Sequence, residues 1–424
     1  MGSLVGGDSA PTPRITFRQV LSRRDFFRVW LSQGISYIGD RLTQVALMIY
    51  VLELANGSAA AVGWFMVSQS LPVIILGPIA GVLVDRWDKR KAMVVCDLLR
   101  AAIIATVPFL GDARLVYLTG FLMSAVSAVF SPALNASLPE LVEGKSEILV
   151  ANSLLFSTKY FTDFLGFGLA GLIVAVAGLK VAFLVDAVTF IGSALCLVGV
   201  TKRLVAGQPR PIDLAGFWAD LKAGIRYHRE NVVVLSLLIS FAAGVLAMGG
   251  FNTLLVVAVK KLLRVSEFWW GFMLCAQAVT MFATVAAIGR WGQKVPRPYL
   301  ILPGFLGIGL GAMGLALATN LPQAFVLYAL IGVANSLFLV PSMSWIQEIV
   351  PFEFRGRVFS LRGMALNLAA IISYGAVGPL ADGFGVSKVM FGIGVLLCVI
   401  TALSSALPGY REIYRRRPPA QAAV

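Results

Sequence analysis

The sequence predicts an all-α membrane protein with twelve transmembrane helices in two six-helix bundles. Of its 424 residues, 58% are hydrophobic and only 13% are charged, whereas a soluble domain carries roughly 25% charged residues. Twelve apolar windows are long enough to cross a bilayer as helices, which takes about 20 residues each. The alternating ten-residue segments of a closed transmembrane barrel are absent from the sequence.

The windows fall into two sets of six, separated by one long polar connection. The first set is expected at residues 30–52, 63–84, 92–110, 116–138, 150–175 and 181–200, and the second at 232–259, 268–289, 299–319, 324–346, 358–380 and 386–407. The predicted domains are an N-terminal arm over 1–29, bundles over 30–200 and 232–407, a linker over 201–231 and a tail over 408–424.

The linker contains apolar residues at helical spacing. Leu214, Phe217, Leu221 and Ile225 recur every three or four positions, which is typical of an amphipathic helix. A helix of this kind is expected to lie along the cytoplasmic face of the membrane, because its polar side prevents it from crossing.

The distribution of basic residues predicts the orientation. Most of the 35 Lys and Arg residues fall in the arm, the linker, the tail and the loops on the same side of the membrane. Because cytoplasmic loops are enriched in Lys and Arg, we expect a multi-pass protein of the inner membrane with both termini in the cytoplasm. The formal net charge of +14 does not indicate nucleic-acid binding, since the bases form no single basic face.

A charged stretch between the second and third windows is the most specific motif. It reads Gly81-Val-Leu-Val-Asp85-Arg86-Trp87-Asp88-Lys89-Arg90-Lys91, and hydrocarbon does not accommodate so many charges. This spacing closely resembles the loop between helices 2 and 3 of the major facilitator superfamily of transporters. The resemblance implies a conformational latch, in which the Asp lies near the N-terminus of helix 11 and is attracted by its dipole. The latch residues are Gly81, Asp85, Arg86, Lys89, Arg90 and Glu140, with Asp97 and Arg100 bracing the loop.

The two halves of the sequence are similar to each other. Asp85-Arg86-Trp87-Asp88 matches Gly289-Arg290-Trp291-Gly292, and Glu140-Leu-Val142 matches Glu348-Ile-Val350. Duplicated halves of this kind occur in the superfamily, with the substrate site between them near the middle of the membrane.

Shorter pieces are similar to the branch that includes macrolide efflux proteins and the enterobactin exporter. They include Gly39-Asp40-Arg-Leu-Thr-Gln-Val45-Ala46, Phe183-Leu-Val-Asp186-Ala-Val-Thr-Phe190 and Arg355-Gly-Arg-Val-Phe-Ser-Leu361. The likeness implies export of amphipathic compounds by proton antiport. The chain departs from the antiporter pattern in helix 5, where Phe167 stands between Gly166 and Gly168 in place of Pro.

Ionisable groups inside the windows are expensive to bury and are therefore candidates for function. Gln33, Tyr37, Asp40 and Gln44 lie on one stripe of helix 1, because residues three and four apart share a helix face. We assign this stripe to the cavity wall and proton coupling to Asp40. Arg41, Lys159 and Asp163 complete a predicted net-neutral cluster between helices 1 and 5. A purely structural ion-pair network is the alternative.

Polar groups of the second half are the remaining candidates for the substrate cavity. They are Asn252, Gln277, Asn335, Asn367 and Tyr374. Hydrogen bonding between helices is the alternative use of such groups. Asp186 in helix 6 is expected to satisfy a neighbouring helix.

Three classes of function remain open. A monomeric, proton-coupled exporter of amphipathic small molecules fits a cavity wall that we expect to be apolar and aromatic. A lipid or lysophospholipid flippase or a metal-ion exporter is the alternative, although a metal site needs clustered His, Cys or carboxylate ligands. A membrane-embedded enzyme fits least, because the single histidine, His228, and dispersed cysteines supply no nucleophile and base. No cofactor or nucleotide-binding motif is predicted.

Overall fold

The computed structural model describes residues 16–202, 204, 214–266, 268–291, 295 and 298–410, which are mainly helical and contain no strand. The first bundle follows the short α1 (Phe17–Leu21) and consists of α2 (Arg24–Leu54), α3 (Ala59–Arg86), α4 (Lys89–Thr106) with the 3-10 turn η1 (Val107–Phe109), α5 (Ala113–Leu141) and α6 (Gly144–Val198). After α7 (Leu214–Glu230), the second bundle consists of α8 (Val232–Met248), α9 (Phe251–Lys261), α10 (Trp269–Trp291), α11 (Pro298–Ala316), α12 (Leu321–Ile349), α13 (Phe352–Phe384) and α14 (Val386–Ala406).

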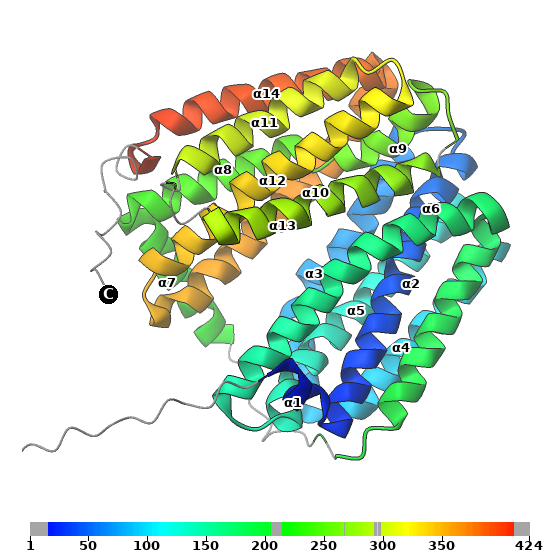
Figure 1. The fold of residues 1–424 in the computed structure, drawn as a ribbon, viewed down its shortest axis with the longest axis vertical. Helices are drawn as coiled ribbons and strands as arrows, with labels where there is room; N and C mark the ends of the chain where they lie inside the picture. Colours follow the sequence, from blue (N-terminus) through cyan, green and yellow to red (C-terminus); the bar gives the residue numbers. More distant parts are fainter. Residues whose placement is uncertain are drawn as a thin grey trace, which may run out of the picture.

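The described residues contain ten helical segments that are long and apolar enough to cross a membrane. One of them, α6, holds two spans, because Gly178 breaks the helix with a φ of 82°, a conformation that glycine adopts without steric cost. Another runs through α8 and α9 as one bent span. α2, which contains Asp40 and Arg41, packs beside α6 as a further helix of the first bundle (Figure 1). The predicted fold of twelve spans in two bundles is thus confirmed.

Several helices extend past the predicted windows. α3 begins at Ala59 instead of residue 63, and α13 begins at Phe352 instead of residue 358. The Ser58 hydroxyl accepts a hydrogen bond from the backbone N–H of Ala61 at 3.3 Å and caps α3. Such polar caps continue a helix beyond its apolar part, so hydropathy alone places the ends too far inside.

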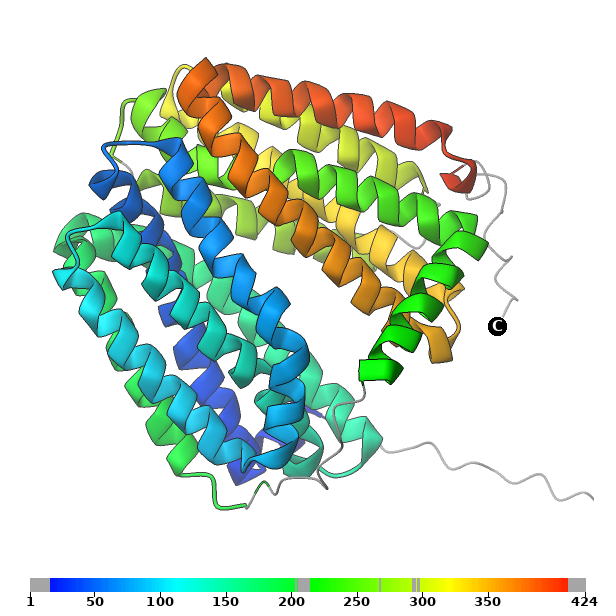
Figure 2. The same cartoon turned by 180° about the vertical axis from the view of Figure 1, so that it is seen from behind.

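The two bundles meet mainly through two pairs of helices, α3 with α13 and α6 with α10. They converge on the side where α3 and α10 begin, which we name the far side. They diverge toward the side where α7 lies, which we name the α7 side (Figures 1 and 2).

Glycines bring the backbones of the two bundles into contact on the far side. A Cβ atom on Gly378 of α13 would lie 2.6 Å from the carbonyl oxygen of Ala59 in α3. A Cβ atom on Gly271 of α10 would lie 3.0 Å from the Cα of Gly171 in α6. Only glycine permits such close approach, and the far side is therefore closed in this structure.

A carboxylate also crosses the closed far side. Asp382, near the end of α13, accepts hydrogen bonds from the Ser58 hydroxyl at 2.7 Å and from the backbone N–H groups of Ala59 at 2.9 Å and Ala60 at 3.0 Å. The first N–H groups of a helix have no partner within the helix, and its positive end attracts an anion. One bundle therefore caps a helix of the other.

Removing this cap is expected to favour opening of the far side. Asp382→Ala leaves the first donors of α3 without their acceptor, and a lost N-terminal cap costs about 1–2 kcal/mol, which corresponds to a roughly 5- to 30-fold shift in a two-state equilibrium. Electron–electron distance measurements between spin labels on the far-side ends of the two bundles report this shift. The matched control is Asp112→Ala, which removes the cap that Asp112 provides to α5 within one bundle. Equal distance distributions in Asp382→Ala and wild type would contradict the expectation.

α7 occupies the segment where the sequence predicts an amphipathic helix, and it packs on α13. The ring of Tyr227 stacks on that of Phe354 with centroids 5.0 Å apart. His228 is buried, and its Nδ1 is 2.8 Å from the carbonyl oxygen of Gly224. The side chains of Leu214, Phe217 and Leu221 lie outside the described ones, and Ile225 is 38% exposed.

The docking of α7 is expected to weaken in acid. Burial lowers the pKa of His228 below its ordinary 6.5, although the Gly224 carbonyl partly opposes this. The docked state therefore favours the neutral ring, so its contribution is fully present above pH 6.5 and is lost as the pH falls through the lowered pKa. A spin label on Lys222→Cys should gain mobility between pH 7.5 and pH values below 6.5, and His228→Gln should remove this dependence. A response that persists in His228→Gln would assign it to another group.

Candidate functional site

A cavity of about 280 Å³ lies within the first bundle, where α2, α4, α5 and α6 face one another. Most of the side chains in its wall are polar or charged, and Phe130, Leu134, Leu155 and Phe156 are the apolar ones. The apolar and aromatic wall expected between the two halves stays a prediction, since this cavity is lined by the first bundle alone. Polar groups inside a membrane protein are stable only where they contact one another, water or a ligand.

The predicted stripe of helix 1 is partly in the cavity. Gln33, Tyr37 and Asp40 line the wall. Gln44 does not, because its side-chain oxygen accepts a hydrogen bond from Nη1 of Arg41.

The predicted cluster of four charges is divided in two. Arg41 Nε and Asp163 Oδ1 form an ion pair at 2.7 Å, and the guanidinium carbon lies 5.3 Å from the centre of the Phe167 ring. Gly166 permits this contact, since a Cβ atom there would lie 2.7 Å from the Cβ of Arg41. Asp40 and Lys159 instead line the cavity.

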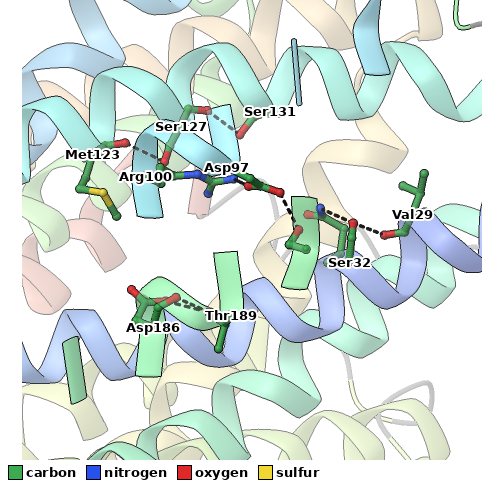
Figure 3. Close-up of polar contacts among 11 residues, drawn as sticks. Val29, Ser32, Asp97, Arg100, Met123, Ser127, Ser131, Asp186 and Thr189 are labelled. Carbon is green, nitrogen blue, oxygen red and sulfur yellow. Dashed lines mark hydrogen bonds and ion pairs between the residues drawn. The ribbon is translucent and has the colours of Figure 1, made fainter. Parts of the chain in front are cut away.

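Arg100 and Asp97 form a buried ion pair in α4, one turn apart. Ser193 of α6 donates to Asp97 at 2.6 Å, and the Arg100 guanidinium lies between the rings of Phe130 and Phe190, at 4.4 and 4.5 Å. Arg100 also belongs to the cavity wall, with Ser127 and Ser131 of α5 (Figure 3). Arg100 thus lines the cavity, and Asp97 holds Arg100 in place. The sequence predicted instead that the pair braces the loop after α3.

The predicted latch residues that the structure describes are bonded within the first bundle. Lys89 pairs with Glu140, and Nη1 of Arg90 donates to the carbonyl oxygen of Val200 at 2.7 Å. Gly81 lies within α3, and the side chains of Asp85 and Arg86 lie outside the described ones. The start of α13, the predicted partner of the latch, belongs to the other bundle, which diverges on this side (Figure 1).

Further contacts tie the α7-side ends of the first bundle together. Arg23 pairs with Glu143 at 2.8 Å, and its guanidinium lowers the pKa of that exposed carboxyl. Lys202 and Thr201 donate their backbone N–H groups to Asp25, each at 2.9 Å. These contacts join the first and last helices of the bundle.

Asp186 is fully buried on α6 and is satisfied by hydroxyl groups. Thr43 of α2 donates to it, as does Thr189 at 3.0 Å. Gly39 leaves the space, since a Cβ atom there would lie 2.0 Å from Oδ1 of Asp186. The neighbour that Asp186 satisfies is therefore helix 1, close to Asp40 in sequence, and Asp186 does not line the cavity.

The candidates of the second half do not line this cavity. Asn252 accepts a hydrogen bond from the Tyr328 hydroxyl at 2.9 Å, which is the helix-to-helix use of such groups. Gln277 packs beside Gly332, and the Tyr374 carbonyl lies against Gly63 at the contact between the bundles. Asn335 is half-buried and Asn367 is exposed.

Several polar residues of the wall escaped the sequence reasoning. They are Ser36, Ser127, Ser131, Asn135 and Asn152. A signal for three of them is present, because Ser127, Ser131 and Asn135 recur every four residues along α5, as the helix-1 stripe does. Hydroxyl and amide groups in apolar helices are common, so this spacing alone does not distinguish a cavity wall from a contact between helices.

Comparisons with known proteins agree with the architecture. The family model described as Major Facilitator Superfamily matches residues 29–374 and 265–423. The chain is 24% identical over 395 residues to macrolide efflux protein A of Streptococcus pyogenes, covering 92% of this chain and 97% of that protein. It is 26% identical over 393 residues to the multidrug efflux pump Tap of Mycolicibacterium fortuitum, covering 88% and 93%.

Solved structures show the same fold. A bacterial homologue of the human lysosomal transporter Spinster, in an inward-facing and unoccupied conformation, superposes with a TM-score of 0.74 at 14% identity, covering 97% of this chain and all of that one. The nucleoside transporter NupG gives a TM-score of 0.73 at 11% identity, covering 93% of this chain and 100% of that one.

Proposed function

The chain belongs to the major facilitator superfamily, and from this membership we propose that it exports amphipathic small molecules, drug-like compounds or siderophore-like metabolites, by alternating access coupled to proton antiport. Its similarity to a macrolide efflux protein and a multidrug efflux pump supports export. In this proposal the chain acts as a monomer in the inner membrane. Its α7 side faces the cytoplasm, because cytoplasmic loops are enriched in Lys and Arg.

The observation that carries the proposal is the position of Asp40. It lies in the wall of a polar cavity within the first bundle, and among the described residues it makes no hydrogen bond or ion pair. Arg41, its neighbour, is engaged by Asp163. An acid without a fixed partner is free to exchange a proton for another cation, and intramembrane acids serve as proton carriers in transporters.

Because the far side is closed, the space between the bundles is accessible from the α7 side in this structure. With the far side closed by Gly378 and Asp382, the bundles diverge toward the α7 side (Figure 2). In alternating access, the bundles rock about a central site and open one side at a time. Substrate therefore enters from the α7 side in this state, as an exporter with a cytoplasmic α7 side requires.

Inverted membrane vesicles test this proposal. Their acidic interior should drive accumulation of an amphipathic fluorescent dye by the wild-type protein, and a protonophore should abolish it. Accumulation that is unchanged by the protonophore would exclude proton antiport. Movement of the dye out of the inverted vesicles would exclude export.

Metal-ion export, the second candidate, finds no positive support in the geometry. Sites for transition metals need several His, Cys or carboxylate ligands close together. No group of three or more such side chains gathers in the part of the chain that the structure describes.

A further inference from the structure

The cavity of the first bundle holds charges of both signs. Asp40 on α2 and Lys159 on α6 both line it. Among the described residues, neither side chain forms a hydrogen bond or an ion pair with the other or with a third group. They thus face one space as an unpaired carboxylate and an unpaired ammonium group.

The neighbouring charged groups behave differently. Arg41 and Asp163 are paired at 2.7 Å, and Asp186 is bonded by Thr43 and Thr189. Such groups are satisfied by the protein itself, as buried charges usually are. Lys159 is exposed and Asp40 is half-buried, so both side chains are open to water or to a ligand that enters the cavity.

Arg100 adds a second donor to the cavity wall, besides Lys159. Its side chain is only 4% exposed, and its Nη2 is paired with Asp97. Its Nε is buried and has no hydrogen-bond partner. A buried polar atom without a partner is costly. Arg100 belongs to the same cavity wall as Lys159, so the wall carries two cationic groups that attract an anion in the cavity.

From these three groups we infer that the cavity binds amphoteric compounds, which carry a protonated amine for Asp40 and a carboxylate for Lys159 and Arg100. The inference rests on the proposed function and names the compounds that the exporter carries. Asp97 neutralises Arg100, so Asp40 and Lys159 leave the wall with balanced charge. A ligand with an amine alone would leave Lys159 unpaired, and one with an acid alone would leave Asp40 unpaired.

The remaining wall fits an amphipathic body. Phe130 and Leu134 of α5 and Leu155 and Phe156 of α6 are apolar, and the volume is about 280 Å³. Small-molecule sites usually begin at roughly 300 Å³. The cavity is slightly smaller than that, so it takes the charged head of a ligand and only part of an aromatic body.

Binding measurements on the purified full-length protein test the inference. The probes are 2-naphthylalanine and a quinolone with a piperazine ammonium and a carboxylate, which differ in the spacing of their charges. Each is compared with its methyl ester, which lacks the anion, and its N-acetyl derivative, which lacks the cation. In the wild type, at least one parent probe should bind tenfold more tightly than both of its derivatives.

Variants assign each charge to its partner. Lys159→Met should bring the parent and the methyl ester to within twofold of each other, and Asp40→Asn should do the same for the parent and the N-acetyl derivative. The matched control is Lys180→Met, which removes an exposed lysine outside the cavity and should keep the tenfold preference. A Lys159→Met protein that retains the preference would overturn the assignment of the carboxylate.

Wild-type protein that binds neither parent more tightly than its derivatives would overturn the inference itself. Failure of the proposed function gives a different result. In that case the binding preferences appear as expected, but inverted vesicles accumulate none of the probes under a proton gradient. Vesicles that accumulate the methyl esters as well as the parents would leave export standing and overturn the preference for amphoteric compounds.

Discussion

Asp40→Asn is expected to abolish accumulation of substrate against its gradient and, at saturating substrate, to leave exchange between the two sides intact. Asparagine keeps the shape of the side chain and stays neutral, so it carries no proton. One charge that crosses 100 mV contributes about 2.3 kcal/mol, which supports a gradient of roughly 50-fold. That whole gradient should be lost in the variant.

The physical reason lies in the surroundings of Asp40. Lys159 shares its cavity, and Arg41 is the next residue in the chain. Because a carboxylate is stabilised by nearby cations, a change in their distance between the two states of the transporter changes its affinity for a proton. A substrate amine that binds at Asp40 displaces the proton, and this competition is what antiport requires.

Two assays on proteoliposomes separate the outcomes. One imposes a pH gradient and measures accumulation, and the other places substrate on both sides and measures exchange. The matched control is Asp186→Asn, which removes a buried acid outside the cavity and should retain accumulation. If Asp40→Asn accumulates substrate and Asp186→Asn does not, the proton is carried by Asp186 and the assignment to Asp40 is wrong.

Gly378→Ala is expected to reduce transport at least about fivefold by preventing closure of the far side. The new Cβ atom would lie 2.6 Å from the carbonyl oxygen of Ala59 and 2.6 Å from the Cα of Ala60. Both are backbone atoms, so α3 and α13 have to separate. Overpacking of this kind costs about 1–3 kcal/mol, and about 1.4 kcal/mol is a tenfold change in an equilibrium.

The matched control for this variant lies on the same helix. A Cβ atom on Gly375, one turn earlier, would meet only Val67 at 3.8 Å, so Gly375→Ala should transport normally. An impermeant maleimide should label Val67→Cys more strongly in Gly378→Ala than in the wild-type background. The labelling of the four native cysteines is subtracted as background. Normal transport by an inserted Gly378→Ala protein would show that this contact is not needed for the cycle.

The sequence predicted the fold because the signals for a membrane fold are local. The length of an apolar run decides whether a helix crosses the bilayer, and each run is visible without its neighbours. The break at Gly178 within α6 falls in the gap between the predicted windows at 150–175 and 181–200. The extension of α13 to Phe352 was not predicted, since it depends on backbone conformation outside the hydrocarbon.

The candidate site was predicted only in part, for a physical reason. Helix 1 carries a stripe of polar residues, and three of its four members line the cavity, including Asp40. Helices in a membrane bundle are apolar on most faces, so periodicity gives little information about which face meets the interior. The roles of Arg100 and Lys159 therefore did not follow from their helices alone.

The sequence by itself determined the class of protein, the number of spans and the likeness to the superfamily, because these depend on the composition and order of single segments. Only the tertiary structure decided which charges are paired and which are free. The hydrogen bond from Ser193 to Asp97 and those from α3 to Asp382 join residues far apart in the chain. Such partners are chosen by the packing of whole helices, and the low polarity of the membrane makes each pairing, or its absence at Asp40, decisive.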